Sequence, residues 1–219
     1  MGLSLELSQV SKTYNGQVIL QDCSWVFEPG LTHVLKGPNG TGKSTLLRVC
    51  ALLEAPDKGR VNYLAGGRPL ALDLELKRRI TLLLPNVGVF NTSVFNNVAY
   101  GLKIRGFERR EIEARVGAIL EVVGLADKKR QRALELSTGQ SKRLGLARAM
   151  VLEPEVLFLD EPTASIDQEN SEIIERIILE MQEKKRATII MVTHDPAQAQ
   201  RLGDRLLLIK NGRLFPSKA

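Results

Sequence analysis

The chain has 219 residues, of which 43% are hydrophobic and 26% are charged. These proportions are ordinary for a globular protein and exclude a disordered chain or a fibre, and the length suits one large α/β domain rather than two independent domains. No apolar run approaches the ~18 residues needed to span a bilayer, and residues 1–6 lack the basic start and apolar core of a signal peptide, so we expect a cytosolic or peripheral protein.

The positive charge is modest, a formal net +6 from 31 Lys and Arg against 25 Asp and Glu. It is densest at residues 105–115 and 128–132, and only 5% of all residues are aromatic. A nucleic-acid groove usually shows a concentrated basic stripe or a stacking platform, so we interpret these stretches as solvated helical faces and expect no nucleic-acid partner. A mild attraction to an anionic membrane surface remains compatible with the charge. Cys23 and Cys50 lie far apart without metal-type spacing and are most simply reduced core residues.

Apolar periodicity predicts strands and helices along the whole chain. In chain order we predict antiparallel strands at 3–7 and 23–27, a strand at 32–36, a helix at 45–53, strands at 59–64 and 79–84, helices at 97–104, 108–123 and 141–150, a strand at 156–159, a helix at 168–183, a strand at 187–192, and a hairpin of 205–209 and 213–215. Asn211-Gly212 is a strong signal for the hairpin turn. Strand and helix thus alternate on both sides of a mainly helical insert, which predicts an α/β fold.

Residues 37–45 read Gly-Pro-Asn-Gly-Thr-Gly-Lys-Ser-Thr and satisfy the phosphate-loop pattern G-x-x-x-x-G-K-[ST] between a predicted strand and a predicted helix. Glycines let successive backbone N–H groups converge on phosphates, and the helix N-terminus adds a partial positive charge. Lys43 would reach the β- and γ-phosphates, and the Ser44 hydroxyl would ligate Mg²⁺. The alternative is a glycine-rich turn that precedes a helix by chance. The predicted strand before the loop and the predicted helix after it make such a chance match rarer. We predict a nucleoside triphosphate site at Asn39, Gly40, Thr41, Gly42, Lys43, Ser44 and Thr45.

Four apolar residues at 156–159 are followed by Asp160 and Glu161. A buried parallel strand has this pattern, and ligands bind beyond the carboxyl ends of such strands. Asp160 would emerge beside Ser44 and hold Mg²⁺ or its water shell. Glu161 would face the water next to the γ-phosphate, as a general base or water-positioning group. An isolated Asp-Glu pair is commonly a helix cap or a surface pair, but we prefer the catalytic interpretation after an apolar strand in a phosphate-loop protein.

Residues 136–140, Leu-Ser-Thr-Gly-Gln, resemble the L-S-G-G-Q signature of ATP-binding cassette proteins, and residues 164–167 resemble the loop that follows the acidic strand in that family. Taken alone, Ser137 is a plausible helix N-cap. Together with the phosphate loop and the acidic strand, the resemblance covers essentially the entire chain. It implies a single domain, 1–219, with a P-loop NTPase core sheet, an N-terminal antiparallel β subdomain and an inserted α-helical subdomain. The nucleotide-binding core would comprise 1–85 and 151–219, and the helical signature subdomain 86–150.

The resemblance also implies that two subunits share each ATP. In this family the signature of one subunit closes over ATP held by another subunit. Ser137, Gly139 and Gln140 would therefore bind the partner's nucleotide in a head-to-tail dimer. The N-terminus of the signature helix would supply the second anion site. Asp167 would bridge the dimer or cap the helix that begins at Gln168, and both roles can hold.

Two further residues gain a role only from the resemblance. Tyr14 matches the aromatic residue that stacks on adenine, and His194 matches the histidine that contacts the γ-phosphate, which would make His194 catalytic together with Glu161 and Lys43. Without the family positions, an exposed turn aromatic and a structural histidine would be the better interpretations.

The chain departs from the family at two positions. Thr138 replaces the first signature glycine, which is tolerable if its φ is negative. Pro85 aligns with a glutamine that ligates Mg²⁺ and senses the transporter, and proline supplies no side-chain oxygen. Metal coordination and coupling to a partner are therefore affected more than nucleotide binding. Asn86 could substitute if the chain bends after Leu84, but in an extended strand it would point to the opposite face, which favours a turn residue.

The resemblance implies an ATPase that hydrolyses Mg-ATP as a peripheral subunit at the cytoplasmic face of a membrane. Its partners would be a second copy in a homodimer, separate transmembrane permease subunits and a solute-binding protein. Residues 91–106 look most like importers of oxyanions such as tungstate, molybdate or phosphate. The alternatives are an ATP-gated interaction module with slow hydrolysis and a soluble cassette protein of DNA repair or translation. A small-molecule kinase would share only the phosphate loop.

Overall fold

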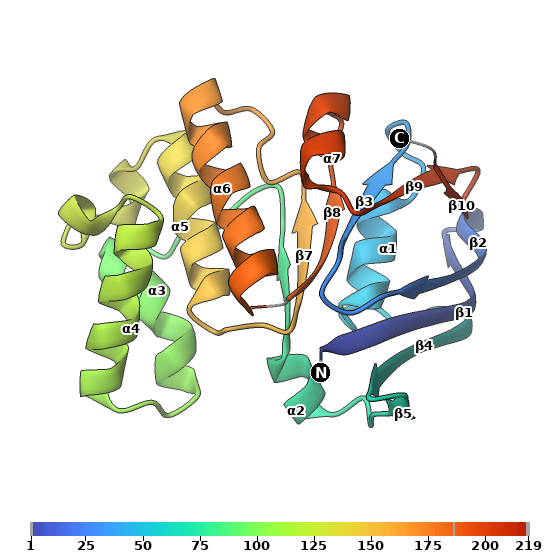
Figure 1. Cartoon of the computed structure of the whole chain (residues 1–219), viewed down its shortest axis with the longest axis horizontal. Coiled ribbons are helices and arrows are strands. Elements are labelled where there is room, and N and C mark those ends of the chain that lie inside the picture. Colours follow the sequence, from blue (N-terminus) through green and yellow to red (C-terminus); the bar gives the residue numbers. More distant parts are fainter. Residues whose placement is uncertain (1, 186, 218–219) are drawn as a thin grey trace.

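Two β-sheets organise the computed structural model, which describes residues 2–185 and 187–217 (Figure 1). The first sheet is antiparallel, in the order β2-β1-β4-β5, and the second has the order β10-β9-β3-β8-β7-β6. In the second sheet all neighbours are parallel except β10, which pairs antiparallel with β9. The strands are β1 (Leu3–Tyr14), β2 (Gln17–Phe27), β3 (Thr32–Lys36), β4 (Lys58–Ala65), β5 (Arg68–Pro69), β6 (Ile80–Leu83), β7 (Val156–Asp160), β8 (Thr188–Val192), β9 (Arg205–Lys210) and β10 (Arg213–Pro216).

Helices cover both faces of the six-stranded sheet. They are α1 (Lys43–Cys50), α2 (Leu74–Arg78), α3 (Val94–Ile104), α4 (Arg109–Val122), α5 (Thr138–Met150), α6 (Gln168–Lys185) and α7 (Pro196–Leu202), with 3₁₀ turns η1 (Ala126–Lys128) and η2 (Ala133–Glu135). α1 lies between the two sheets, while α3, α4 and α5 gather at the opposite end of the molecule and α6 lies against the outer sheet face (Figure 1). No helix in the described residues is long and apolar enough to cross a membrane.

The central strands β7 and β8 are mostly apolar because both of their faces are buried. On β7, Val156 and Phe158 pack with α1 in one core, and Leu157 and Leu159 pack with the helices of the other core. The same alternation holds on β8. The predicted α/β fold, with a mainly parallel sheet, an antiparallel N-terminal sheet and a helical segment between β6 and β7, is confirmed.

The two N-terminal strands are longer than predicted, because β-bulges interrupt the sequence pattern by which a strand is recognised. The pairing of β1 with β2 shifts register after Leu7 and again after Val10, and Gln9 and Asp22 both have positive φ. Each bulge inserts a residue and so breaks the period-two alternation that identifies a strand in sequence. The prediction of residues 3–7 and 23–27 therefore found only the regular ends of these strands.

Helix boundaries also differ where capping decides them. α3 and α5 begin three residues earlier than predicted, because Ser93 and Ser137 serve as N-caps. α1 ends before the predicted position 53, because Leu52 adopts a left-handed φ of 58°. The short helices α2 and α7 were not predicted. The Asp195-Pro196 pair, an N-cap followed by proline at the first helical position, was a usable signal for α7.

Candidate nucleotide-binding and hydrolysis site

The phosphate loop joins β3 to α1 at the carboxyl end of the parallel strands. Gly42 is the N-cap of α1 with φ of 98°, and a Cβ atom there would come within 2.9 Å of the Ile19 carbonyl oxygen. Only glycine accepts both the left-handed backbone and this close approach. Within the described part of the chain no side chain caps α1, so the N–H groups of its first turn are open to an anion.

Lys43 lies across the mouth of this loop. Its ammonium group donates to the carbonyl oxygens of Gly37 and Pro38, at 2.8 Å each, and the side chain is buried. Burial lowers the pKa of Lys43, while the carboxylates of Glu161 and Asp160 oppose that shift. A buried cation held by neutral carbonyls can exchange these bonds for phosphate oxygens, which suits the predicted contact with the nucleotide.

Asp160 ends β7 and is almost fully buried. Burial raises its pKa, and a hydrogen bond from Ser44 opposes this. Among the described residues Asp160 Oδ1 has no hydrogen-bond partner, which is rare for a buried carboxylate oxygen. An orphaned carboxylate oxygen beside a hydroxyl fits a hard cation and its water ligands, so these two residues could hold Mg²⁺. No cluster of three His, Cys, Asp or Glu side chains in the described ranges could hold a metal alone, so phosphates and water would complete the coordination.

Glu161 and His194 meet because of the strand register. β7 pairs in parallel with β8, with Asp160 opposite Val192, so the residues that follow the two strands lie side by side. Glu161 Oε1 is 2.8 Å from His194 Nε2, and the Glu161 N–H donates to the Val192 carbonyl at 3.1 Å. Glu161 has a left-handed φ of 50°, a conformation that concentrates at functional sites. Its carboxylate is partly exposed, so it can accept a proton from water.

The signature segment opens α5 with a complete capping box. Ser137 Oγ accepts the N–H of Gln140 at 3.3 Å, and Gln140 Oε1 accepts the N–H of Ser137 at 3.1 Å. Thr138 is not among the residues with positive φ, which meets the condition for replacing the family's glycine. A Cβ atom on Gly139 would come within 2.4 Å of Asn170 on α6. The capping box and this contact fix the start of α5 against α6.

The phosphate loop and the signature segment line two separate cavities. The first, of about 480 Å³, is lined by Ile19, Asn39, Gly40, Gly42, Lys43, Ser44, Thr45 and Glu161. The second, of about 430 Å³, is lined by Pro85, Asn86, Val87, Leu136, Thr138, Ser141, Lys142, Glu161, Ala164 and Ser165. Glu161 borders both. The structure therefore brings the phosphate loop, Asp160, Glu161 and His194 together and leaves Ser137, Gly139 and Gln140 outside the first cavity, as expected of a site shared between subunits.

Tyr14 and Asp167 have local partners in the structure. The Tyr14 hydroxyl donates to the Glu54 carboxylate, and this bond is the main reason that the pKa of Tyr14 is raised. Tyr14 also interacts with Thr45 at the end of the phosphate loop, and its adenine-stacking role remains a prediction. The Asp167 carboxylate accepts the backbone and side-chain N–H groups of Asn170, at 2.8 Å. This is the predicted helix-cap role, and the dimer-bridging role of Asp167 remains a prediction.

The chain bends at Pro85 and Asn86. β6 ends at Leu83, and both residues of the bend line the second cavity with Glu161. Residues 85 and 86 form a bend beyond the end of β6, as the interpretation of Asn86 as a turn residue expects, so the alternation of an extended strand does not apply to them. Asn86 therefore stays a candidate to supply the oxygen that Pro85 lacks.

Sequence reasoning missed Lys142. This lysine of α5 is 7% exposed, and its ammonium group donates to the Glu161 carbonyl oxygen at 3.1 Å. Burial lowers the pKa of Lys142, while Glu161 and Asp160 oppose that shift. The one available signal was its place in the signature helix, between the buried Gly139 and Gly145.

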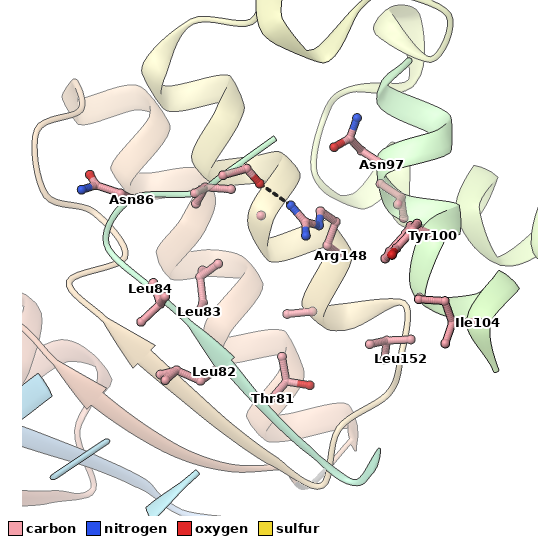
Figure 2. A pocket seen from close by; sticks show the side chains of 16 residues that line it. Thr81, Leu82, Leu83, Leu84, Asn86, Asn97, Tyr100, Ile104, Arg148 and Leu152 are labelled. Carbon is pink, nitrogen blue, oxygen red and sulfur yellow. Dashed lines mark hydrogen bonds between the residues drawn. The ribbon is translucent and has the colours of Figure 1, made fainter. Parts of the chain in front are cut away.

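A further hollow of about 350 Å³ lies between β6, α3 and α5, and we call it the β6–α3–α5 groove (Figure 2). Tyr100 and Ile104 of α3 line it and are 48% and 66% exposed. The Phe90 ring lies 4.6 Å from that of Tyr100 and 4.8 Å from the Arg148 guanidinium. Arg148 also donates to the Gly88 carbonyl, the dashed line in Figure 2. The groove thus presents apolar and aromatic surface around one cationic side chain.

Comparison with known proteins identifies the relatives of this arrangement. A family model described as "ABC transporter" matches residues 20–164. A tungstate uptake system ATP-binding protein, TupC of Peptoclostridium acidaminophilum, is 38% identical over 212 residues, which is 97% of both chains. ATP-binding proteins for iron import in Agrobacterium fabrum and methionine import in Listeria monocytogenes are 36% and 37% identical, but the chain spans only 61% and 64% of their lengths.

Two solved structures share the fold, each with a TM-score of 0.86 over 98% of this chain. One is CbiO1 of Clostridium perfringens, part of an ABC transporter complex, at 30% identity and 88% coverage of that chain. The other is a dimeric ATP-binding cassette in a post-hydrolysis state bound to ADP and Pi, at 25% identity and 99% coverage.

Proposed function

This chain belongs to the ABC transporter family as an ATP-hydrolysing subunit, and on that premise we propose that it powers import of an oxyanion of the tungstate kind. The observation that carries the substrate class is the similarity to a tungstate uptake protein over nearly the full length of both chains. The longer iron and methionine relatives support an importer without naming its cargo.

For hydrolysis we assign the phosphates to the phosphate loop and Lys43, and the attacking water to Glu161. Ser44 and Asp160 would hold Mg²⁺, which when bound neutralises phosphate charge. Glu161 would accept the proton of the water. His194 lies 2.8 Å from the Glu161 carboxylate, would hold it in place and would contact the γ-phosphate. Tyr14 would stack on the base.

Completion of this site requires a second subunit. The signature residues Ser137, Gly139 and Gln140 lie outside the cavity of the phosphate loop, and a related cassette was solved as a dimer with ADP and Pi. These observations support a head-to-tail homodimer with two shared ATP molecules. We also propose the division into a nucleotide-binding core, 1–85 and 151–219, and a helical signature subdomain, 86–150.

We place the permease contact at the β6–α3–α5 groove, on the cytoplasmic face of the membrane. The groove's exposed Tyr100 and Ile104 (Figure 2) offer apolar area to a short helix, and Phe90 and Arg148, which contact each other beside Tyr100, add an aromatic ring and one charge. Pro85 and Asn86 lie in the segment between this groove and Glu161, so motion at the groove would reach the hydrolysis site. A solute-binding protein would deliver the oxyanion outside.

The test is uptake in cells that lack this gene. Deletion should abolish high-affinity accumulation of tungsten, measured by mass spectrometry of washed cells, and the wild-type gene should restore it. Glu161→Gln should fail to restore it at equal expression. Accumulation of molybdenum, phosphate, iron and methionine is measured in parallel. Loss of iron or methionine uptake with normal tungsten would reject the oxyanion assignment, and normal uptake of all five would favour the ATP-gated interaction module.

A further inference from the structure

The geometry points to Lys142 as a positioning residue for ATP hydrolysis, holding the backbone of Glu161 from the signature helix. This inference rests on the proposed role of Glu161 as the group that activates water. It adds a residue outside the phosphate loop, the acidic strand and the signature pentapeptide.

The burial of Lys142 requires an explanation. Its side chain is 7% exposed in the second cavity, and a lysine is almost never buried unless its ammonium group is bound. The Lys142 ammonium group donates a hydrogen bond to the Glu161 carbonyl oxygen at 3.1 Å. An apolar residue would fill the same space without the desolvation cost, so the contact itself is the reason for the lysine.

The Glu161 backbone is held at three points. Its N–H donates to Val192 at 3.1 Å, and its carbonyl oxygen accepts from the Ala164 N–H at 3.2 Å and from Lys142. These bonds keep φ at 50°, which a glutamate adopts only under constraint. The same φ aims the carboxylate at His194. Lys142 is the one of these three anchors that comes from the helical segment between β6 and β7.

This bond connects the signature helix α5 to the end of β7 that carries Glu161. Thr138, Ser141 and Lys142 line the same cavity from the first turns of α5, opposite Pro85 and Asn86. Displacement of α5, as when the signature binds a partner's nucleotide, therefore moves the ammonium group relative to the Glu161 carbonyl. Pro85 also lines this cavity but offers neither a hydrogen-bond donor nor a side-chain acceptor. Among the described residues, the bond from Lys142 to the Glu161 carbonyl is therefore the polar contact that links α5 to Glu161.

The experiment compares steady-state hydrolysis by wild type, Lys142→Met and Lys142→Arg in the full-length protein. Lys142→Met keeps the length and apolar stem but removes the donor, and should lower kcat about tenfold with little change in KM for ATP or in ATP affinity, because a misplaced general base slows chemistry without affecting binding. Lys142→Arg keeps a cationic donor and should recover most of the loss. Lys58→Met, on an exposed lysine of β4, is the matched control and should be unchanged. If Lys142→Met does not fold, Lys142→Gln replaces it and should give an intermediate kcat.

The double variant Glu161→Gln/Lys142→Met decides whether Lys142 acts through Glu161. Single-turnover hydrolysis in Glu161→Gln should not fall further when Lys142 is also changed, because the carboxylate that Lys142 positions is already gone. An additional tenfold loss, or a wild-type kcat in Lys142→Met, overturns the inference. Full activity of Glu161→Gln alone would instead reject the proposed function of Glu161, so the two failures are distinguishable.

Discussion

Pro85 is the residue at which this site departs most from its family. β6 ends two residues before it, and the bend at 85 and 86 brings both side chains to the cavity that Glu161 borders. Proline cannot ligate a cation, whereas the Asn86 carboxamide has an oxygen and lies next to it. Asn86 also lines the β6–α3–α5 groove, but in Figure 2 its carboxamide points away from Tyr100 and Ile104.

We expect Pro85→Gln to lower the magnesium concentration needed for half-maximal hydrolysis by about fivefold, since one added oxygen ligand contributes roughly 1 kcal/mol. Asn86→Ala should raise that concentration by a similar factor if Asn86 supplies the substitute oxygen. The measurement is ATPase rate against magnesium at saturating ATP. No change in Pro85→Gln would mean that the missing ligand does not limit the enzyme, and no change in Asn86→Ala would remove the substitute.

His33 makes stability depend on pH. It is fully buried, its Nε2–H donates to the Glu28 carbonyl at 3.2 Å, and Nδ1 has no partner among the described residues. Burial therefore lowers the pKa of His33 below its usual value. Between that usual value of about 6.5 and the lowered folded value, the unfolded chain binds a proton that the folded chain does not. Stability falls as pH decreases through this window, by about 1.4 kcal/mol per unit for one proton.

Urea unfolding between pH 8 and pH 5 measures this slope. His33→Gln keeps a donor for Glu28 and cannot titrate, so its free energy of unfolding should fall less steeply below pH 6.5, even if the variant is less stable at pH 8. Identical slopes for wild type and His33→Gln would assign the acid sensitivity to other groups.

At the scale of elements, the sequence predicted the type of most strands and helices and erred at their ends. Short apolar or β-prone runs identified β3, β7 and β8, because strands buried on both faces are mostly apolar. It failed across Gln9 and Asp22, where bulges change the period, and at α2 and α7, which are too short to show helical periodicity. α3 and α5 begin three residues before the predicted positions, because Ser93 and Ser137 cap them and the apolar pattern alone does not mark a capped start.

Two of these caps allow a matched test of the signature helix. Ser93 caps α3 and Ser137 caps α5 with the same bond to the third helical N–H, at 3.2 and 3.3 Å. Each change to alanine should lower the free energy of unfolding by about 1 kcal/mol. Only Ser137→Ala should also lower ATPase activity, by about tenfold, because its hydroxyl is predicted to contact the partner's γ-phosphate. Equal ATPase loss in both variants would show that Ser137 acts only as a cap.

At the scale of the molecule, the part of the site that the sequence predicted is the part that strand topology organises. Ser44, Asp160 and Glu161 lie at or beyond the carboxyl ends of parallel strands, which share one edge of the sheet, and the structure brings the three residues together. Their catalytic roles remain predictions. The Lys142 contact could not be predicted, because its partner is a backbone carbonyl 19 residues away and such a bond leaves no pattern of residue types. The relation between the two cavities also needed coordinates.

The separation of those two cavities predicts how activity depends on concentration. If the signature of one copy completes the phosphate site of another, the ATPase rate per subunit should rise with protein concentration and level off when the dimer saturates. Glu161→Gln should bind ATP and lose steady-state turnover, retaining only a slow residual single-turnover rate. It should elute from a size-exclusion column as a dimer with ATP and as a monomer without it, because hydrolysis then releases the closed state only slowly. Lys43→Ala removes the cation from the phosphate loop, so it should bind ATP weakly and stay monomeric at the same concentration. The contrary result is a specific activity that stays constant from dilute to concentrated protein, together with Glu161→Gln that remains monomeric in ATP. Each chain would then hydrolyse ATP alone, and Ser137, Gly139 and Gln140 would have no nucleotide to bind.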